Sequence, residues 1–249
     1  MKNLLKEKLQ KGQVVIGTGI GIGHPDVTET LSRLGFDWLF IDGEHAPLSI
    51  ETMQVLMQAM NGTDCTPIVR PQWNGMVIIK RVLDIGAHGI IVPWVNTKEE
   101  AEYAVRACKY PPQGLRGCAP RRIGLFDPDY IKTANDETLV VVQIETRTAV
   151  KNIDDILSVE GVDACCIGPQ DLSISFGFQC PQWDNPQYME VFDKVLAAAK
   201  KRAKAAGVVI PQERARWAIE KGFTFLSVGG DLGFMMQGAR ELLEQVRSS

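Results

Sequence analysis

The sequence lacks the features that mark several large classes of protein. Its 249 residues contain no C-x-x-C pair and no His–Cys cluster at zinc-finger spacing, which argues against a structural zinc site. No stretch approaches the ~18 consecutive apolar residues of a membrane span, and the N-terminus lacks the apolar segment of a signal peptide. A formal net charge of −3, without a long basic run, gives no electrostatic footprint for nucleic acid or anionic lipid. We therefore expect a cytoplasmic protein with no nucleic-acid or membrane partner.

Two further absences concern cofactors and disulfides. The glycines at 17, 19, 21 and 23 alternate strictly, so the G-x-G-x-x-G fingerprint is missing, and we expect no nucleotide cofactor. The six cysteines follow no metal-binding pattern, and Cys165 and Cys166 lie within an apolar run. Because free cysteine usually packs as a small buried hydrophobe, we expect all six to be reduced thiols.

The residues that are present have the composition of an ordinary globular protein, 45% apolar and 23% charged. After an amphipathic segment at 3–11, the chain repeats a short apolar run, a turn and a segment of helical periodicity. The eight apolar runs are 14–17, 38–42, 67–70, 89–93, 139–145, 164–168, 208–211 and 225–229. Helix starts are expected at Pro25, Ser49, Thr97 with Glu100 as a capping box, Thr146 and Pro186.

Eight such units favour a single closed (β/α)8 barrel, a TIM barrel of the α/β class spanning 1–249, over an open doubly wound sheet. The continuous apolar runs are typical of parallel strands buried on both faces. Two longer insertions, at 110–136 and 173–185, are expected to follow strand ends on the catalytic side of the barrel.

Reactive groups in such barrels lie at the C-terminal ends of the strands, and polar residues gather there in this sequence. The candidates are Asp42, Glu44 and His45 after the second run, Arg70 after the third, Gln143 and Glu145 after the fifth, and Gln170 and Asp171 after the sixth. No lysine lies at these ends, which disfavours Schiff-base chemistry and leaves a divalent metal as the sink for a carbanion.

Two carboxylates in this set suit a hard cation such as Mg²⁺ or Mn²⁺. Gln143 and Glu145 are two apart on a strand, so both side chains point to the same side of the sheet, and Asp171 follows the neighbouring strand. This arrangement leaves open positions for water and substrate oxygens. Taken alone, Asp171 could instead cap the short helix that begins at Leu172.

His45 is the natural candidate for proton transfer, because it stands directly after a strand beside Asp42 and Glu44. Arg70 is well shaped to bind a carboxylate or a developing enolate oxygen. Residues alone leave a second interpretation of Arg70 open, which is a structural ion pair with Asp42 or Glu44. The other two histidines, His24 and His88, precede a helix and a strand and receive no role.

Several motifs in a fixed order give nearly the whole chain a specific resemblance to one family. The motifs are Asp42-Gly43-Glu44-His45-Ala46-Pro47, Val69-Arg70-Pro71, Lys109-Tyr110-Pro111-Pro112-x-Gly114-x-Arg116-Gly117, Gln143-Ile144-Glu145-Thr146 and Ile167-Gly168-Pro169-x-Asp171-Leu172-Ser173. With them the sequence resembles the HpcH/HpaI aldolases, the metal-dependent class II pyruvate aldolases.

The resemblance implies a barrel whose last helix is exchanged between subunits of a homohexamer. It also implies that Glu145 and Asp171 bind a divalent ion, Mg²⁺ or Mn²⁺ with Co²⁺ as a further candidate. His45 would be the base, Arg70 would stabilise an enolate, and Asp42 completes the set of catalytic candidates.

The same resemblance assigns substrate-binding residues and a more distant acid. Gln143 and the backbone at Gln170 and Asp171, together with Arg70, would hold pyruvate. The acid that tunes the histidine matches Asp84. Because the segment carrying Asp84 ends on the opposite side of the barrel from its own active site, we expect Asp84 to act across a subunit interface or not at all.

The implied reaction is the reversible retro-aldol cleavage of a 4-hydroxy-2-oxo acid to pyruvate and an aldehyde through a metal-stabilised enolate. The chain would therefore be a carbon–carbon lyase. The alternatives are a transferase that condenses an enolate with a thioester, a non-catalytic barrel and a phosphosugar isomerase.

Some positions depart from the family pattern on the acceptor side of the site. Relatives often carry an aromatic residue where this chain has Thr18-Gly19-Ile20, and a small residue where it has Gln170. Arg121 and Arg122 could reach an acidic acceptor, although a solvated or interfacial pair fits them equally well. Asp231, after Gly229-Gly230, is expected to cap the last helix and to repel phosphate.

Overall fold

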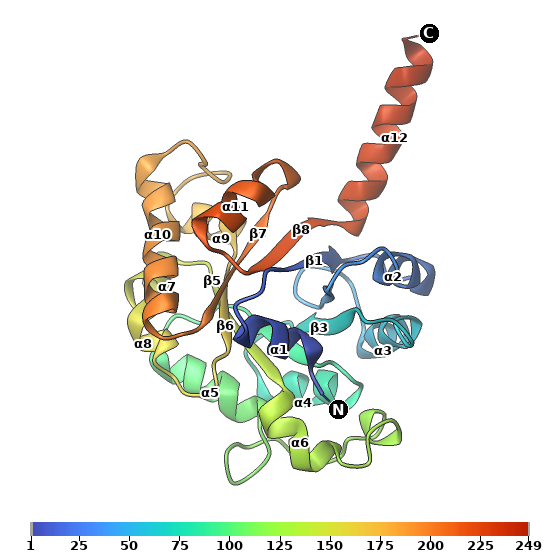
Figure 1. Cartoon of the computed structure of the whole chain (residues 1–249), viewed down its shortest axis with the longest axis vertical. Coiled ribbons are helices and arrows are strands. Elements are labelled where there is room, and N and C mark those ends of the chain that lie inside the picture. Colours follow the sequence, from blue (N-terminus) through green and yellow to red (C-terminus); the bar gives the residue numbers. More distant parts are fainter. Residues whose placement is uncertain (1, 249) are drawn as a thin grey trace.

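The fold, a computed structural model that describes residues 2–248, is a closed barrel of eight parallel strands with helices around it (Figure 1). The strands pair in sequence order, and β8 closes the barrel against β1. Their bounds are β1 Val15–Ile20, β2 Trp38–Asp42, β3 Thr66–Arg70, β4 Gly89–Val92, β5 Leu139–Ile144, β6 Ala164–Ile167, β7 Ala205–Ile210 and β8 Phe225–Gly230. The predicted (β/α)8 architecture is confirmed.

Five helices begin where the sequence predicts, at Pro25 and Pro186 and directly after Ser49, Thr97 and Thr146. Ser49 and Asn185 accept from backbone amides in the first turns of their helices, and Thr97 forms the predicted capping box with Glu100. The helices are α1 Leu4–Gln10, α2 Pro25–Ser32, α3 Ile50–Ala59, α4 Met76–Asp84, α5 Lys98–Cys108, α6 Tyr130–Glu137, α7 Arg147–Lys151, α8 Ile153–Leu157, α9 Pro169–Ser175, α10 Pro186–Lys201, α11 Ala215–Lys221 and α12 Asp231–Arg247. Short 3₁₀ turns lie at η1 Ile123–Leu125 and η2 Gln212–Arg214.

Strand side chains pack in two directions. One set fills the barrel interior around Trp38, whose ring stacks on Phe225 with centroids 4.0 Å apart. Leu5 and Leu9 of α1 join this interior cluster, so α1 closes the N-terminal end of the barrel. The other set packs against the surrounding helices in a larger core. The opposite, C-terminal end of the barrel carries the polar side chains of Asp42, Arg70, Gln143 and Glu145.

One of the two insertions was predicted on the wrong side of the barrel. Residues 110–136 follow α5 and precede β5, which places them at the N-terminal end, beside α1. Asn3 donates from its side chain to the Glu137 carbonyl over 2.8 Å, which ties the end of this segment to the start of the chain. The insertion at 173–185 follows β6 and lies on the C-terminal side as expected. The segment 110–136 follows the end of helix α5 and not the end of a strand, which accounts for the difference.

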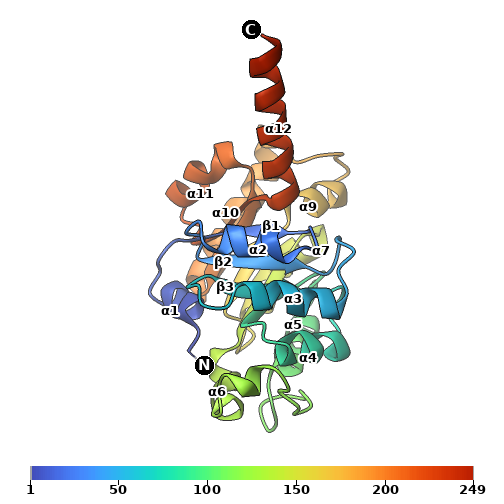
Figure 2. The same cartoon turned by 90° about the vertical axis from the view of Figure 1, so that its right-hand side faces the viewer.

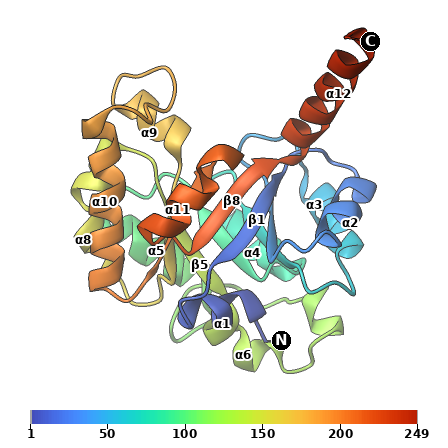
Figure 3. The ribbon, with the colours of Figure 1, turned by 45° about the horizontal axis from the view of Figure 1, so that its top comes forward.

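Helix α12 projects away from the barrel (Figures 1, 2 and 3). Its first residue, Asp231, is buried, and the remaining residues are exposed or partly exposed. Large exposed apolar side chains lie along it, at Leu232, Met235, Met236, Leu242, Leu243 and Val246. No helix among residues 2–248 is long and apolar enough to cross a membrane. A helix with this much uncovered apolar surface is unusual on a monomer.

Candidate active site

The candidate residues meet at the C-terminal mouth of the barrel because they end neighbouring strands. Asp42 of β2 is in register with Arg70 of β3, and Gln143 of β5 is in register with Cys166 of β6. The two strand pairs face each other across the mouth. There the negative charge of Glu145 interacts electrostatically with Arg70 and with Glu44.

On the β2–β3 side, Asp42 organises both a side chain and a turn. Its two carboxylate oxygens accept from Arg70 Nε over 3.0 Å and Nη2 over 2.7 Å, a bidentate pair. Oδ1 also accepts from the backbone amides of Glu44 and His45. Although burial acts to raise it, these donors lower the pKa of Asp42 below its ordinary value. The ion pair that the sequence left open for Arg70 is therefore present.

Glu44 lies between Arg70 and His45. Its Oε2 atom is 3.3 Å from Arg70 Nε and 3.7 Å from His45 Nε2. The Glu44 side chain is only 9% exposed, whereas that of His45 is 59% exposed. Burial, opposed by Arg70 and reinforced by Glu145, raises the pKa of Glu44 to about 7. A carboxyl group in this state can hold or release a proton near neutral pH.

On the β5 side, Glu145 and Gln143 are almost completely buried. Glu145 Oε1 accepts from the Trp94 amide over 2.7 Å, and Oε2 accepts from the Gln143 side-chain amide. Burial raises the pKa of Glu145, and the neighbouring Asp171 adds to that shift. Trp94 adopts a positive φ of 56°, which is uncommon for a residue with a side chain and directs its amide at Glu145.

Asp171 lies in the first turn of α9, and the helix starts at Pro169. The cap residue is Gly168, so the interpretation of Asp171 as a cap is wrong. Gly168 is closely packed, because a Cβ atom there would lie 3.0 Å from Glu145 Oε2 and 3.1 Å from Gln143 Nε2. The Gln170 side chain points away to donate to the Gln179 carbonyl, over 3.0 Å, so only its backbone remains available to the mouth.

Asp84 does not join the other candidates. It ends α4 on the opposite side of the barrel and accepts from Arg116 Nη2 over 2.7 Å. Arg116 is buried, and its guanidinium lies over the ring of Tyr110, 4.5 Å from the centroid. Burial raises the pKa of Asp84, opposed by Arg116. Within one chain, the expectation that Asp84 is remote from the site is confirmed.

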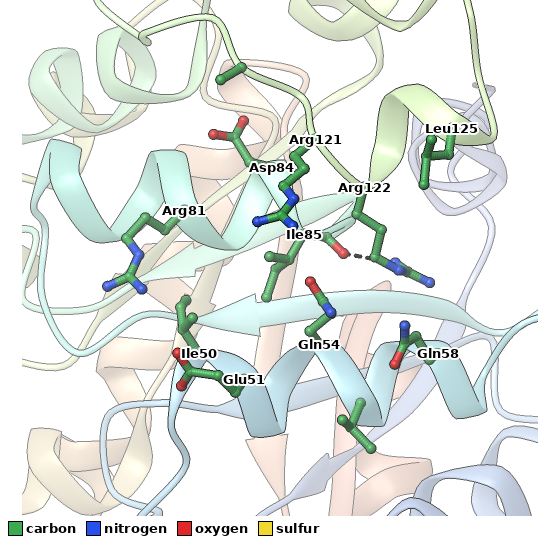
Figure 4. A pocket seen from close by; sticks show the side chains of 12 residues that line it. Ile50, Glu51, Gln54, Gln58, Arg81, Asp84, Ile85, Arg121, Arg122 and Leu125 are labelled. Atoms are coloured by element: carbon green, nitrogen blue, oxygen red, sulfur yellow. Dashed lines mark hydrogen bonds between the residues drawn. The ribbon is translucent and has the colours of Figure 1, made fainter.

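A groove of about 710 Å³ opens beside Asp84, far from the strand ends (Figure 4). Glu51, Gln54 and Gln58 lie along α3 on one wall, and Arg81 and Asp84 lie on α4 on the other. None of the strand-end candidates lines this groove. The groove is therefore not the reaction site of its own chain, despite its volume.

Three other expectations have structural outcomes. Arg122 donates to the Ile85 carbonyl over 2.7 Å and to Asn61, at the N-terminal end, so it does not reach an acceptor in its own barrel. Arg121 lines the groove beside Asp84. The expectation that Asp231 caps α12 is wrong, because the cap residue is Gly230; Asp231 Oδ2 instead accepts from the amides of Gly21 and Ile22 and so secures the loop after β1. His88, for which the sequence predicts no role, lies at the N-terminal end of the barrel, where burial lowers its pKa to about 4.

The cysteines agree with the expectation of reduced thiols. All six are free, and Cys65, Cys108, Cys165 and Cys166 are buried. Burial raises the pKa of Cys65 and Cys165 to about 12, so these thiols are inert.

Replacing Glu44 by glutamine should stabilise the metal-free protein at alkaline pH. The raised pKa means that the folded chain retains a proton that an unfolded carboxyl releases near pH 4.5. The resulting stabilisation is complete below about pH 4.5 and is lost as the pH rises through about 7. Thermal unfolding in EDTA should show Glu44→Gln about 1 kcal/mol more stable than wild type at pH 8, roughly 2–4 °C, and the gap should close at pH 4.5. A gap independent of pH would contradict the assignment.

Known proteins share both the sequence and the fold. Residues 20–237 match the family model described as HpcH/HpaI aldolase/citrate lyase. A 4-hydroxy-2-oxo-heptane-1,7-dioate aldolase from Escherichia coli is 41% identical over 250 residues, covering 97% of this chain and 94% of the relative.

Solved structures give the same picture. An HpcH/HpaI aldolase/citrate lyase family protein from Burkholderia cenocepacia J2315 superposes with a TM-score of 0.94 at 31% identity, covering 99% of this chain and 100% of the other. The citrate synthase SbnG superposes with a TM-score of 0.87 at 30% identity, covering 98% and 97% of the two chains. The similarity therefore extends to proteins named for two different reactions.

Proposed function

This chain belongs to the HpcH/HpaI aldolase/citrate lyase family, and we propose that it cleaves a 4-hydroxy-2-oxo acid reversibly into pyruvate and an aldehyde. It is a carbon–carbon lyase. The observation that carries the proposal is the buried Glu145 carboxylate, held by Gln143 and the Trp94 amide beside Asp171 at the C-terminal mouth. The name of the E. coli relative makes 4-hydroxy-2-oxo-heptane-1,7-dioate the first substrate to assay.

The residues at the mouth fit a divalent cation. No cluster of three or more His, Cys, Asp or Glu side chains arranged to hold a metal occurs among residues 2–248, so a protein-only cage is absent there. Glu145 and Asp171 instead offer two carboxylates. Burial raises the pKa of Glu145 and the nearby charge of Asp171 adds to the shift, and a cation bound by both carboxylates would offset both effects. Mg²⁺ and Mn²⁺ suit such a site, since they accept few protein ligands and leave positions for substrate oxygens.

The other residues supply binding and charge. A bound divalent ion would lower the pKa of the methyl protons of pyruvate by polarising its ketone. Gln143 and the backbone at Gln170 and Asp171 hold the pyruvate oxygens. Arg70, fixed by Asp42, faces the negative charge that develops on the enolate oxygen, and the His45 system takes the proton. Cleavage follows the same steps in reverse.

Assembly into a hexamer is part of the proposal. The uncovered apolar side of α12 supports exchange of this helix with a neighbouring subunit. The groove beside Asp84 supports a contact through which Asp84 faces the mouth of another barrel. Sedimentation of the wild type and of a chain truncated after Asp231 tests the helix exchange, because a truncated chain that keeps its assembly would contradict it.

The experiment that tests the reaction is deuterium uptake into the methyl group of pyruvate, followed by proton NMR in D₂O. We expect uptake with Mn²⁺ or Mg²⁺ and none after EDTA, because enolate formation needs the cation. A subsequent screen of aldehydes identifies the acceptor. An absence of exchange with every divalent metal would refute the pyruvate half of the proposal.

Substitution of Gly168 by alanine should impair this exchange with little loss of fold. The added methyl group would press on Glu145 Oε2 and Gln143 Nε2, so both must shift by a few tenths of an ångström. We expect a roughly tenfold lower rate and weaker Mn²⁺ binding, with about 1 kcal/mol of destabilisation. Gly124→Ala, where the new Cβ meets only Pro120 at 3.8 Å, is the matched control. Equal rates for the two variants would show that the close approach at Gly168 has no role.

A second candidate reaction is condensation of an enolate with a thioester. The likeness to the citrate synthase SbnG favours testing it. Product formation that requires acetyl coenzyme A and oxaloacetate, without aldehyde, would select this reaction over the aldol cleavage.

A further inference from the structure

Asp231, the first residue of α12, is a buried acid that binds backbone outside its own helix. Its Oδ2 atom accepts from the Gly21 amide over 2.9 Å and from the Ile22 amide over 2.7 Å. Asp231 is only 7% exposed. Hydrogen bonds from backbone amides to a charged carboxylate are among the stronger ones in proteins. The first turn of α12 is therefore joined to the loop after β1, 210 residues away in the sequence.

The loop after β1 lies against the segment that carries His45. A Cβ atom at Gly21 would lie 3.6 Å from the Cβ atom of Ala46. One at Gly23 would lie only 3.1 Å from the Leu48 side chain, so the absence of a side chain at Gly23 allows a close approach. The two segments follow the C-terminal ends of β1 and β2, which are paired in the barrel. The loop therefore packs along the residues that directly follow His45.

The first turn of α12 is anchored in its own barrel. Gly229 has a φ of 67°, and a Cβ atom there would lie 2.5 Å from the Phe234 ring. That ring stacks on Phe36 with centroids 6.4 Å apart. From Met235 onwards the helix is exposed and projects from the barrel (Figure 3). The start of α12 thus belongs to the barrel that carries it, whichever molecule covers the rest of the helix.

We propose that Asp231 is a positioning residue for proton transfer, because it holds the loop after β1 against the turn that carries His45. The inference rests on the proposed function, in which the His45 system takes the methyl proton of pyruvate. This role requires no contact between Asp231 and the substrate. The two amide bonds fix the loop, and the loop limits the movement of the turn. A displacement of about 1 Å at a reacting group costs up to about 10²-fold in rate.

The proposed metal and pyruvate ligands are held by other parts of the barrel. Gln143 lies on β5, Glu145 follows it, and Asp171 lies in α9 after β6. Glu145 accepts from the Trp94 amide and from the Gln143 side chain. Release of the loop after β1 should therefore lower the rate of proton transfer and leave the binding of metal and pyruvate unchanged.

The test measures methyl exchange by Asp231→Ala over a range of pyruvate concentrations at saturating Mn²⁺. We expect kcat about tenfold lower than in wild type, with KM for pyruvate and Mn²⁺ affinity within about twofold. Asp231→Asn keeps an oxygen that can accept from both loop amides, so it should recover most of the lost rate. Glu244→Gln, which removes an exposed acid from the projecting part of α12, is the matched control.

Amide hydrogen exchange followed by mass spectrometry reports on the loop and the turn without metal or substrate. In Asp231→Ala we expect faster exchange in peptides covering 18–24 and 42–48, and wild-type exchange in peptides from β5 and β6. Gly23→Ala is a second variant, because it presses the loop against the Leu48 side chain without altering α12. It should show the same separation of kcat from KM, with a smaller loss of rate.

This inference and the proposed function can fail separately. Wild-type protein without methyl exchange would overturn both. Active wild type together with an Asp231→Ala variant whose kcat stays within threefold, or whose 42–48 peptide exchanges as in wild type, would overturn the role of Asp231 alone. Sedimentation accompanies each assay, since a rate lost together with the assembly would also overturn it. If Asp231→Ala does not fold, Asp231→Asn and Gly23→Ala carry the same test.

Discussion

Replacement of Glu145 by alanine should abolish metal-dependent exchange of the pyruvate methyl protons. The change removes one of the two proposed ligands and leaves the Trp94 amide and the Gln143 side chain without their acceptor. Stabilisation of a developing charge by a cation contributes several kcal/mol, and each 1.36 kcal/mol is tenfold in rate. We therefore expect a loss of about 10³-fold or more, measured by proton NMR in D₂O.

A binding measurement separates loss of the metal from loss of the fold. Titration with Mn²⁺, followed by its electron paramagnetic resonance signal, should show much weaker binding to Glu145→Ala than to wild type. Glu190→Ala, which removes an exposed acid on α10, is the matched control and should bind normally. Exchange in Glu145→Ala that stays within tenfold of wild type and is still abolished by EDTA would contradict the assignment of Glu145 as a ligand.

The barrel could be predicted from the sequence because its strands are buried on both faces. The β5 segment, Leu139–Ile144, is buried at every position and reads as an apolar run in which only Gln143 is polar. The predicted bounds of a strand are less accurate where small residues continue it. β1 extends to Ile20 through Gly17 and Gly19, and β7 begins at Ala205 rather than at 208, because alanine and glycine give little hydrophobic signal.

Part of the site was also predictable, because parallel strands bring their C-terminal ends to one place. Asp42, Arg70 and Glu145 follow this rule and meet at the mouth. The low exposure of the Glu44 side chain relative to that of His45 could not be predicted, since it depends on the conformation of the turn that carries both residues. Trp94 was missed because its contribution is a backbone amide aimed by a positive φ, which no side-chain pattern reveals.

The position of residues 110–136 follows from the element that precedes them in the chain. An insertion after a strand faces the catalytic mouth, whereas one after a helix faces the opposite end. Here the helix α5 runs to Cys108, so Arg121 and Arg122 lie with Asp84 at the N-terminal end. Any role of these residues in the reaction therefore needs a second subunit, which a single sequence does not show.

Arg70 gives the second large expected effect, and it concerns both rate and stability. Arg70→Ala removes the guanidinium that we propose stabilises the enolate oxygen, and loss of one such donor costs about 10²–10³ in rate. It also leaves Asp42 and Glu44 buried without their cation, and breaking a buried pair in this way costs about 3 kcal/mol of unfolding free energy. Methyl exchange and chemical denaturation, both at pH 7, measure the two losses.

The pH dependence identifies the source of the lost stability. Arg70 lowers the pKa of Asp42, so the pair contributes stability that is present above the ordinary Asp value of 3.8 and is lost as the pH falls through the lowered pKa. The gap in unfolding free energy between wild type and Arg70→Ala should therefore shrink in acid. Arg70→Lys keeps the charge but not the bidentate geometry and should be intermediate in both measurements. Arg33→Ala, which breaks an exposed pair with Glu29, should cost no more than about 0.5 kcal/mol. If Arg70→Ala lost stability equally at all pH values, the loss would come from packing over Phe40 rather than from the carboxylates.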